Sequence, residues 1–463
     1  MQVEWDQIVT YYLLYSLGGL AILLTLLHML YRRRSPTSII AWLLIMVIAP
    51  YFFVFFYFLF GVRKRSLEKE KSSLAISEKK GEHPSAHPID RLLRSNGIPS
   101  SSSDNTLRLY TDGVEAYETL YDALDTAEHS ISLSTYVLKY DTVTKALFEL
   151  LIKKSLSGVK VRILTDAVGS IEVYLRQLPL KRLKDAGVTV SFFMPLFGFP
   201  FHNRFNLRYH RKIYLIDDAL LFSGGMNLSK EYMGPSHTKK RWVDLLYRCE
   251  GSIVSYYIDI FESDWAFTQQ LTPKKTFTAP SSKKGECKLQ VIPSGPDVRN
   301  DALLEAIIYG IHQASRRVWI VTPYFLPNEP ILQALRIAHH RGVDVKLITP
   351  KESDHLFADF GRSSYTRELH DSNIDVALYE GPMLHAKAIL FDDDAAMLGS
   401  VNLDNRSLLL NYEVVTIAYS KEQIDAMLQW MNGLLQRSTS RIEPAGKFRR
   451  IFENLMRVFA SQL

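Results

Sequence analysis

The stretch His210-Arg-Lys212-Ile-Tyr-Leu-Ile-Asp217 occurs a second time further along the chain, as His385-Ala-Lys387-Ala-Ile-Leu-Phe-Asp392. Both copies have the pattern H-x-K-x4-D. In both, a glycine follows at the same spacing from the histidine, then a glycine or serine, then an asparagine two positions further on. One such pattern arises easily by chance, but two copies in the same register indicate a duplicated unit. The duplication predicts a shared site to which each half contributes a histidine and a lysine.

The residue types of this shared site favour chemistry on a phosphodiester. A histidine can act as a nucleophile, or as a general acid or base near neutral pH. A lysine brings positive charge to phosphate oxygens, and amide, hydroxyl and backbone N–H groups donate to an oxyanion. We therefore expect a covalent phosphohistidine mechanism with no metal and no other cofactor. The expected catalytic set is His210, Lys212, Asp217, His385, Lys387 and Asp392, with Gly225, Asn227, Ser400 and Asn402 as phosphate-binding or supporting residues.

The surroundings of each copy predict a hairpin. Residues 213–228 and 388–403 both have an apolar strand, an Asp-rich turn, a second apolar strand and a glycine turn. In such a hairpin the histidine and lysine, two positions apart, project from one face of the first strand. Asp217 and Asp392 fall in the turns, so we interpret these two members of the catalytic set as structural turn or ion-pair residues.

Further repeats predict the fold class. Gly158–Asp166 parallels Gly342–Pro350, and each follows an amphipathic helix, at about 144–156 and 330–340. Apolar runs at 131–138 and 318–325 precede those helices. Each half is therefore strand–helix–strand followed by a hairpin, an α/β arrangement. We expect two α/β/α halves packed about a pseudo-twofold axis, with the motif strands meeting at the seam.

The amino-terminal region predicts two transmembrane helices. Ile8–Leu30 and Ile39–Phe60 are 23 and 22 residues long without a formal charge, and about 20 apolar residues cross a bilayer. Pro50 leaves a shallow re-entrant hairpin open for the second run. Three arginines, 32–34, separate the runs, and five cations follow: Arg63, Lys64, Arg65, Lys69 and Lys71. Because positive residues favour the cytoplasmic side, we expect the amino terminus and the catalytic region there.

Composition and linkers suggest the domain boundaries. The expected parts are a membrane anchor over 1–65, a flexible tether over 66–105, a first half over 106–268, a linker over 269–285 and a second half over 286–463. The formal charge of +6 suits an anionic lipid surface, although a nucleic acid would attract the same charge. Cys249 and Cys287 are the two cysteines, without a disulfide framework, which suits a reducing cytoplasm.

Two charged or amphipathic segments leave alternatives open. A basic cluster near the first motif either faces the lipid or is an ordinary solvated surface; it comprises Arg204, Arg208, Arg211, Lys239, Lys240 and Arg241. Residues 448–463 place Phe452, Leu455, Phe459 and Leu463 at helical spacing. That apolar face either packs on the globular core or contacts a membrane surface.

The motifs resemble those of the phospholipase D superfamily and, within it, the bacterial cardiolipin synthases. The resemblance covers nearly the whole chain. It rests on Asn206-x-Arg208-x-His210-Arg-Lys212 and on Gly399-Ser400-x-Asn402-x-Asp404-x-Arg406-Ser407, followed by Asn411-x-Glu413. Thr322–Pro327 and Phe261–Trp265 are further family-like segments. These segments together are far more specific than the H-x-K-x4-D pattern alone.

The resemblance implies a two-step phosphatidyl transfer at the bacterial cytoplasmic membrane. One histidine attacks the phosphorus of a phosphatidylglycerol while the other protonates the departing glycerol. A second phosphatidylglycerol then takes up the phosphatidyl group, giving cardiolipin. Family analogy assigns the nucleophile to His210 and acid/base work to His385, a choice that the symmetric sequence leaves open. Hydrolysis, another lipid donor such as phosphatidylethanolamine, and a membrane-associated nuclease remain alternatives. The paired apolar runs argue against a nucleic-acid substrate and for an anionic bilayer as partner.

The resemblance also supplies an orienting carboxylate for each histidine. Glu413 lies downstream of His385 and matches the family's orienting acid. Its counterpart in the first half is Asp244, which follows His210 at a somewhat longer spacing. Val243 stands where the family commonly has an arginine, which weakens that second match. By this reasoning each acid serves the histidine of its own half.

Overall fold

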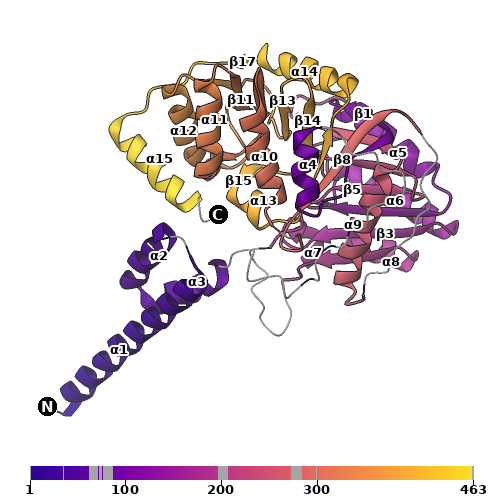
Figure 1. Cartoon of the computed structure of the whole chain (residues 1–463). Coiled ribbons are helices and arrows are strands. Elements are labelled where there is room, and N and C mark those ends of the chain that lie inside the picture. Colours follow the sequence, from indigo (N-terminus) through magenta and orange to yellow (C-terminus); the bar gives the residue numbers. More distant parts are fainter. Residues whose placement is uncertain are drawn as a thin grey trace. The chain divides into compact units, whose positions relative to one another are not determined.

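The structure is a computed structural model that describes residues 2–34, 36–61, 71, 74, 76, 87–196, 207–272, 284–298 and 300–460 (Figure 1). The chain forms two compact units. One is 1–66 together with 197–206, and the other is 67–196 together with 207–463. Five residues of the expected basic clusters, and most of the expected linker, lie outside the described residues: Arg63, Lys64, Arg65, Lys69, Arg204 and residues 273–283.

Among the described residues, the first unit contains one helix long and apolar enough to cross a membrane. This is α1 (Gln2–Tyr31), in which the candidate span is Gln7–Tyr31. The second apolar run divides into α2 (Pro36–Ile48) and α3 (Pro50–Phe60), of 13 and 11 residues. The second expected transmembrane helix is therefore not continuous, because proline disfavours helical geometry at the residue before it and offers no N–H.

The helices of this unit pack on one another through a small cluster. Ala49 adopts φ −148° and ψ 83°, which turns the chain between α2 and α3. Met29, Met46 and Tyr57, one from each helix, are buried together, and the Tyr57 hydroxyl lies 2.9 Å from Nδ1 of His28. The broken second run thus folds back along α1.

The second unit is built on a mixed sheet of 15 strands. Their order is β17-β12-β11-β9-β13-β14-β16-β8-β1-β7-β6-β5-β2-β3-β4. The first-half strands are β1 (Ser102–Tyr110), β2 (Ser130–Thr135), β3 (Lys160–Asp166), β4 (Thr189–Phe193), β5 (Ile213–Ile216), β6 (Leu220–Gly224) and β7 (Leu246–Glu250). The second-half strands are β8 (Cys287–Ser294), β9 (Arg317–Val321), β11 (Asp344–Pro350), β12 (Asp375–Tyr379), β13 (Ala388–Phe391), β14 (Ala395–Gly399), β16 (Glu413–Ala418) and β17 (Ser438–Thr439). The short β10 (Phe325–Leu326) and β15 (Leu403–Asp404) pair separately in parallel.

This order confirms two related halves and corrects the expected seam. Counting outward from the centre, β1, β7, β6, β5, β2, β3 and β4 mirror β8, β16, β14, β13, β9, β11 and β12. The seam is the antiparallel pair of β1 and β8. The motif strands β5 and β13 lie inside their own halves, because each pairs antiparallel with a strand of the same half, β2 or β9.

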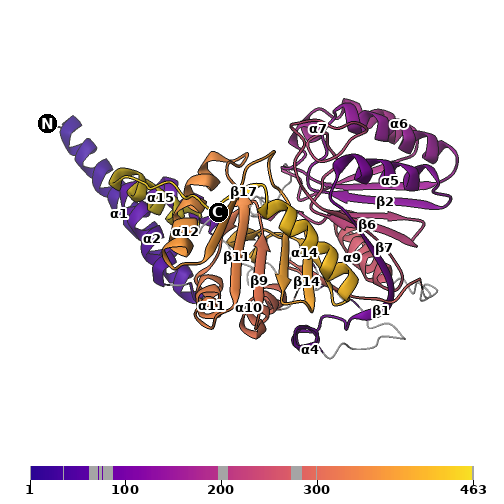
Figure 2. The ribbon, with the colours of Figure 1, turned by 90° about the horizontal axis from the view of Figure 1, so that it is seen from above.

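Helices cover both faces of the sheet. In the first half, α5 and α6 lie on one face and α9 on the other, and in the second half α10 and α11 lie opposite α14 (Figure 2). The first-half helices are α5 (Gly113–Asp125), α6 (Thr142–Leu156), α7 (Ile171–Leu175), α8 (Leu178–Asp185) and α9 (Ile253–Thr268). The second-half helices are α10 (Ala302–Gln313), α11 (Glu329–His340), α12 (Leu356–Asp371), α13 (Asn405–Leu409), α14 (Lys421–Leu435) and α15 (Lys447–Ala460). The two helices expected from periodicity are α6 and α11, capped by the side chains of Asp141 and Asn328.

The carboxyl-terminal part of the expected tether is folded. Residues 88–95 form α4 (Pro88–Ser95), and β1 begins at Ser102. Ile89 and Leu93 of α4 are buried in the core of the second half. The polar composition of this segment predicted a flexible tether. The helix is stabilised by its short apolar stripe, which packs against residues that are distant in the sequence.

Candidate active site

Both motif histidines precede their strands instead of lying within them. His210 and Lys212 stand before β5 at Ile213, and His385 and Lys387 stand before β13 at Ala388. Each histidine segment pairs with backbone of the other half. The His210 N–H donates to the Tyr412 carbonyl at 2.9 Å, and the His385 N–H donates to the Val243 carbonyl at 2.8 Å. The site is therefore assembled from crossed extended segments, and the expected projection from a strand face is wrong in this detail.

The carboxylates pair with the histidines across the two halves. Nδ1 of His210 lies 2.9 Å from Oε2 of Glu413, and Nδ1 of His385 lies 2.7 Å from Oδ2 of Asp244. We expected each acid to serve the histidine of its own half. The structure reverses this, because the segments before β5 and β13 each pair with the strand region that carries the other half's acid. All four side chains are almost completely buried.

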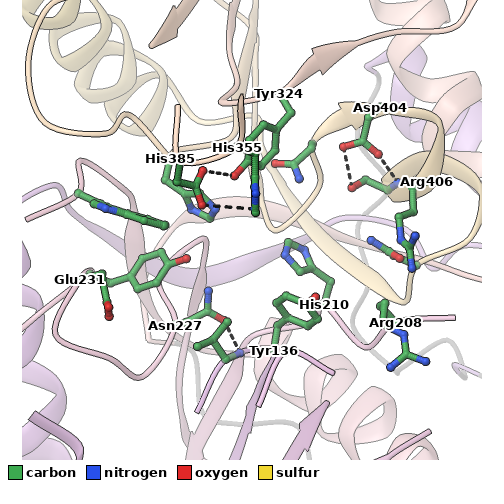
Figure 3. Close-up of a pocket in the computed structure, with 18 of the residues that line it drawn as sticks. Tyr136, Arg208, His210, Asn227, Glu231, Tyr324, His355, His385, Asp404 and Arg406 are labelled. Carbon is green, nitrogen blue, oxygen red and sulfur yellow. Dashed lines mark hydrogen bonds and ion pairs between the residues drawn. The ribbon is translucent and has the colours of Figure 1, made fainter. Parts of the chain in front are cut away.

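This pairing fixes the chemistry of the imidazoles. A carboxylate at Nδ1 favours the tautomer with its proton on Nδ1, which leaves the Nε2 lone pair for attack or proton transfer. His210 and His385 both line a single pocket of about 380 Å³ (Figure 3). Burial lowers the pKa of His210, although Glu413 opposes the shift. Burial and the neighbouring Lys387 lower the pKa of His385 to about 4, so both rings are neutral without an anion in the pocket.

The two acids stay ionised in this setting. Burial alone would raise the pKa of Glu413, but His210 and Lys212 hold it below its ordinary value. Burial would likewise raise the pKa of Asp244, and Lys387 and His385 hold it low. Each acid therefore remains a fixed negative charge behind its histidine.

The motif lysines are buried directly beneath the histidines. Nζ of Lys212 donates to the His210 carbonyl at 2.8 Å, and Nζ of Lys387 lies 3.0 Å from Nε2 of His385. Burial lowers the pKa of Lys212 to about 7 and that of Lys387 to about 8. An anion in the pocket would favour the charged form of both lysines, as a phosphate-binding role requires.

The predicted supporting residues flank the same pair of acids. Ser400 donates from Oγ to Oε2 of Glu413 at 2.5 Å. Gly225 holds the equivalent position, and a Cβ there would collide with the carboxylate of Asp244. The first copy has glycine at this position because the side chain of Asp244 is short and its carboxylate lies against the backbone. The longer side chain of Glu413 leaves room for Ser400 in the second copy.

The two asparagines present unpaired polar atoms at the pocket. Oδ1 of Asn227 accepts from the Val137 N–H at 3.1 Å, which leaves Nδ2 without a hydrogen-bond partner among the described residues. Oδ1 of Asn402 is also buried without a partner there. Both asparagines line the pocket. Buried amides without partners are costly, so they indicate a site for a polar ligand.

The motif aspartates lie away from the pocket. Asp217 accepts from the backbone N–H groups of residues 128, 129 and 130 at 2.7–2.9 Å. Asp392 does the same with the N–H groups of residues 315, 316 and 317. Both have positive φ, at 51° and 48°. They fasten the hairpin turn to the start of β2 or β9, which agrees with their interpretation as structural residues.

The pocket walls contain residues that motif spacing did not predict as site residues. Tyr136 lies edge-on to His210, with ring centroids 5.0 Å apart, and Tyr232 and Trp242 both lie 5.2 Å from the His385 ring. Asp354 and His355 line the pocket beside Tyr324, whose hydroxyl donates to Asp354 at 2.5 Å. Tyr232, Asp354 and His355 carry no spacing signal, since they come from loops that only the fold brings to the site.

The basic cluster expected at the first motif has several roles. Arg208 lines the pocket and donates to Asp166 at 3.2 Å. Arg211 is fully buried and pairs with Asp264 and Asp297, so it is a structural residue. Lys239 and Lys240 are exposed, and Arg241 donates to the Gly234 carbonyl. Among the described members of the cluster, Arg208 therefore lines the pocket and the other four do not.

The sequence and the fold of this chain are similar to those of known proteins. Residues 120–265 and 307–435 match a family model described as cardiolipin synthase, PLD-like domain. The chain is 32% identical to the cardiolipin synthase of Geobacillus thermodenitrificans (strain NG80-2), over 86% of this chain and 82% of that protein. It is also 32% identical to cardiolipin synthase 2 of Bacillus anthracis, over 93% and 88%. Among solved structures, phosphatidylserine synthase of Haemophilus influenzae Rd KW20 superposes with a TM-score of 0.62 at 13% identity, over 81% of this chain and 100% of that one, a likeness of fold alone.

Proposed function

The chain belongs to the cardiolipin synthase family of phospholipase D-like phosphatidyltransferases, and on that premise we propose that it joins two phosphatidylglycerol molecules into cardiolipin and free glycerol. One observation carries the proposal. Two histidines, each held at Nδ1 by a buried carboxylate of the other half, line one pocket together. This arrangement suits a nucleophile and a proton donor that act on the same phosphorus.

In the first step Nε2 of His210 attacks the phosphorus of the donor lipid. The bond from phosphorus to the glycerol oxygen breaks, and the His385 imidazolium gives its proton to that oxygen. The pKa of about 4 at His385 belongs to the pocket without an anion. The negative charge of a bound phosphodiester raises this pKa and supplies the protonated form that the step needs.

In the second step His385 takes a proton from a hydroxyl of the second phosphatidylglycerol. The resulting oxygen nucleophile attacks phosphorus, and the bond from phosphorus to Nε2 of His210 breaks. His210 returns to its neutral state and His385 to its protonated state, so atoms and protons balance over the cycle. In this proposal Lys212, Lys387 and the amide N–H groups of Asn227 and Asn402 stabilise the negative charge on the phosphoryl oxygens.

The membrane arrangement is part of the same proposal. We propose that α1 and the broken α2–α3 segment both cross the cytoplasmic membrane and leave the second unit on the cytoplasmic side. The uncharged runs Ile8–Leu30, within α1, and Ile39–Phe60, over α2 and α3, support this. Lys71 no longer counts among the cations after the second run, because it is buried against Asp264 and Asp297. Four cations there against three at residues 32–34 still favour a cytoplasmic catalytic unit.

Lipid mass spectrometry on the purified full chain tests the reaction. With phosphatidylglycerol alone we expect cardiolipin and glycerol, no product from His210→Ala or His385→Ala, and normal turnover from His237→Ala, whose side chain is 80% exposed on the surface. Phosphatidic acid in place of cardiolipin would mean hydrolysis. No product until phosphatidylethanolamine is added would mean a different donor.

A trapped intermediate tests the assignment of the histidines. Rapid quenching during turnover, followed by peptide mapping, should place the phosphatidyl group on Nε2 of His210. An adduct on His385 would reverse the two roles. An enzyme that makes cardiolipin without any adduct would contradict the covalent mechanism.

A further inference from the structure

The last described helix, α15, is attached to the protein by its polar face. Glu453 is 1% exposed and accepts from Arg367 of α12 and from Nε of Arg449 at 2.9 Å. Arg457 pairs with Glu368 of α12. The buried side of this helix is therefore an ion-pair surface, whereas an amphipathic helix on a globular core ordinarily buries its apolar stripe.

The apolar side chains of α15 are largely exposed. Phe448, Ile451, Phe452 and Leu455 are 90%, 66%, 41% and 50% exposed. Their positions, i, i+3, i+4 and i+7, place them on one side of the helix. Of the residues on which the sequence left packing or membrane contact open, Phe452 is partly packed and Leu455 is half exposed, while Phe459 and Leu463 lie outside the described side chains. Four large apolar residues on one exposed stripe indicate an interaction surface.

This stripe continues toward the active site. Phe452 contacts Phe360 of α12, with ring centroids 5.0 Å apart at 89°. At the start of α12, Leu356 and Phe357 are each 66% exposed, and they directly follow His355, which lines the pocket. A single apolar surface thus runs from α15 along α12 to the wall of the pocket.

The charge of α15 identifies the partner as an anionic lipid surface. Arg449 and Arg457 are paired with Glu453 and Glu368, whereas Lys447 and Arg450 are exposed and enter none of these ion pairs, so they leave positive charge on the outer side of the helix. Basic residues beside an exposed apolar stripe are the pattern of a helix that lies in the membrane interface. A second copy of the chain fits less well, since a twofold contact through this helix would bring two such positive charges together.

We propose that α15 and the start of α12 form a membrane-docking surface, here called the docking stripe: Phe448, Ile451, Phe452, Leu455, Leu356 and Phe357. The stripe inserts into the headgroup and upper acyl region of an anionic bilayer and holds the pocket mouth against the leaflet from which the substrates come. This inference rests on the proposed lipid substrate, because only a lipid needs a route from the bilayer into the pocket.

A fluorescence experiment on the full chain tests the contact directly. Cys249 and Cys287 are buried, so Ile451→Cys can be labelled selectively with an environment-sensitive dye. In vesicles of phosphatidylglycerol and phosphatidylcholine, we expect nitroxide-labelled lipids to quench the dye strongly and aqueous iodide to quench it weakly. Leu178→Cys, at a position 79% exposed on α8, is the matched control and should show the opposite pattern.

Two results would overturn the docking stripe. Quenching at position 451 by iodide alone would mean that the stripe faces water. Protection from both quenchers would mean that protein covers it, either a second copy or another part of the chain. Neither readout depends on catalysis, so this experiment can fail while the proposed reaction stands.

An activity comparison adds a functional readout. The double substitution Ile451→Asn and Leu455→Asn should lower turnover of vesicle-borne phosphatidylglycerol by about tenfold, since interfacial binding scales with buried apolar area. Turnover of a short-chain phosphatidylglycerol dissolved as monomer should stay unchanged, as should both activities of Leu178→Asn. Equal loss on both substrates would assign the stripe a structural role instead. Absence of product even from the unsubstituted protein would count against the proposed function and leave the quenching result to decide the docking stripe.

Discussion

Each motif histidine pairs with an acid that is far away in the sequence. Glu413 raises the pKa of His210 against the effect of burial, and Asp244 does the same for His385. Glu413→Gln should therefore lower the pKa of His210 and leave that of His385 nearly unchanged, and Asp244→Asn should do the reverse. The pH dependence of carbethoxylation by diethyl pyrocarbonate, resolved for each histidine by peptide mass spectrometry, measures both values. A shift at His385 in Glu413→Gln would contradict the crossed pairing.

The pKa values of the two motif lysines predict how the rate of the reaction falls at alkaline pH. Burial gives Lys212 a pKa of about 7 and Lys387 a pKa of about 8 in the free protein. Both bind phosphate only when protonated, so kcat/KM should fall as the pH rises through this range. Bound phosphodiester favours the charged lysines, so kcat should fall at higher pH than kcat/KM does. Steady-state rates in mixed micelles measure both profiles, and a kcat/KM that stays constant through this range would contradict phosphate binding by these lysines.

The sequence predicted those site residues that belong to the repeated motif. His210 and His385, with their lysines, follow from one pattern found twice, and the structure brings both histidines to one pocket. The crossed carboxylates were not predictable, because a separation of 203 residues between His210 and Glu413 carries no information about contact. Asp354 and His355 were missed for a related reason: only the loop after β11 brings them into the pocket that the histidines line.

At the scale of elements, local patterns succeeded and long-range pairing failed. Periodicity located α6 and α11, and alternating apolar runs located both hairpins. The seam between β1 and β8 escaped prediction, since strand order depends on pairing between segments that are remote in the sequence. Proline is the local exception: Pro50 already marked the position where the second apolar run divides.

Lys71, a residue of the expected tether, is buried in an ion-pair cluster with Arg211 next to the active site. Lys71 pairs with Asp264 and Asp297, and Arg211 pairs with the same two acids. Two cations thus balance two carboxylates, all of them at most 4% exposed. Arg211 also donates to the Glu413 carbonyl at 3.1 Å, so the cluster supports the segment that carries His210.

Removal of the Lys71 charge should therefore destabilise the catalytic unit. Lys71→Met leaves an uncompensated buried carboxylate, which costs about 3–5 kcal/mol. Chemical unfolding in detergent, followed by tryptophan fluorescence, should show this loss, whereas Lys240→Met at an exposed position should change stability by less than about 0.5 kcal/mol. Equal unfolding midpoints for the two variants would mean that Lys71 does not occupy this cluster in solution.

At the scale of the whole molecule, the number of membrane crossings decides on which side each end lies. If α1 and the α2–α3 segment both cross, the amino terminus and the catalytic unit share the cytoplasmic side. If α2 and α3 instead re-enter and leave on the same face, one crossing by α1 puts the two ends on opposite sides. Gln2→Cys and Leu178→Cys report these positions, because the native cysteines are buried. We expect a membrane-impermeant maleimide to label both only after the cells are opened. Labelling of Gln2→Cys in intact cells, with Leu178→Cys protected, would establish a single crossing and would explain why Pro50 divides the second apolar run into two short helices.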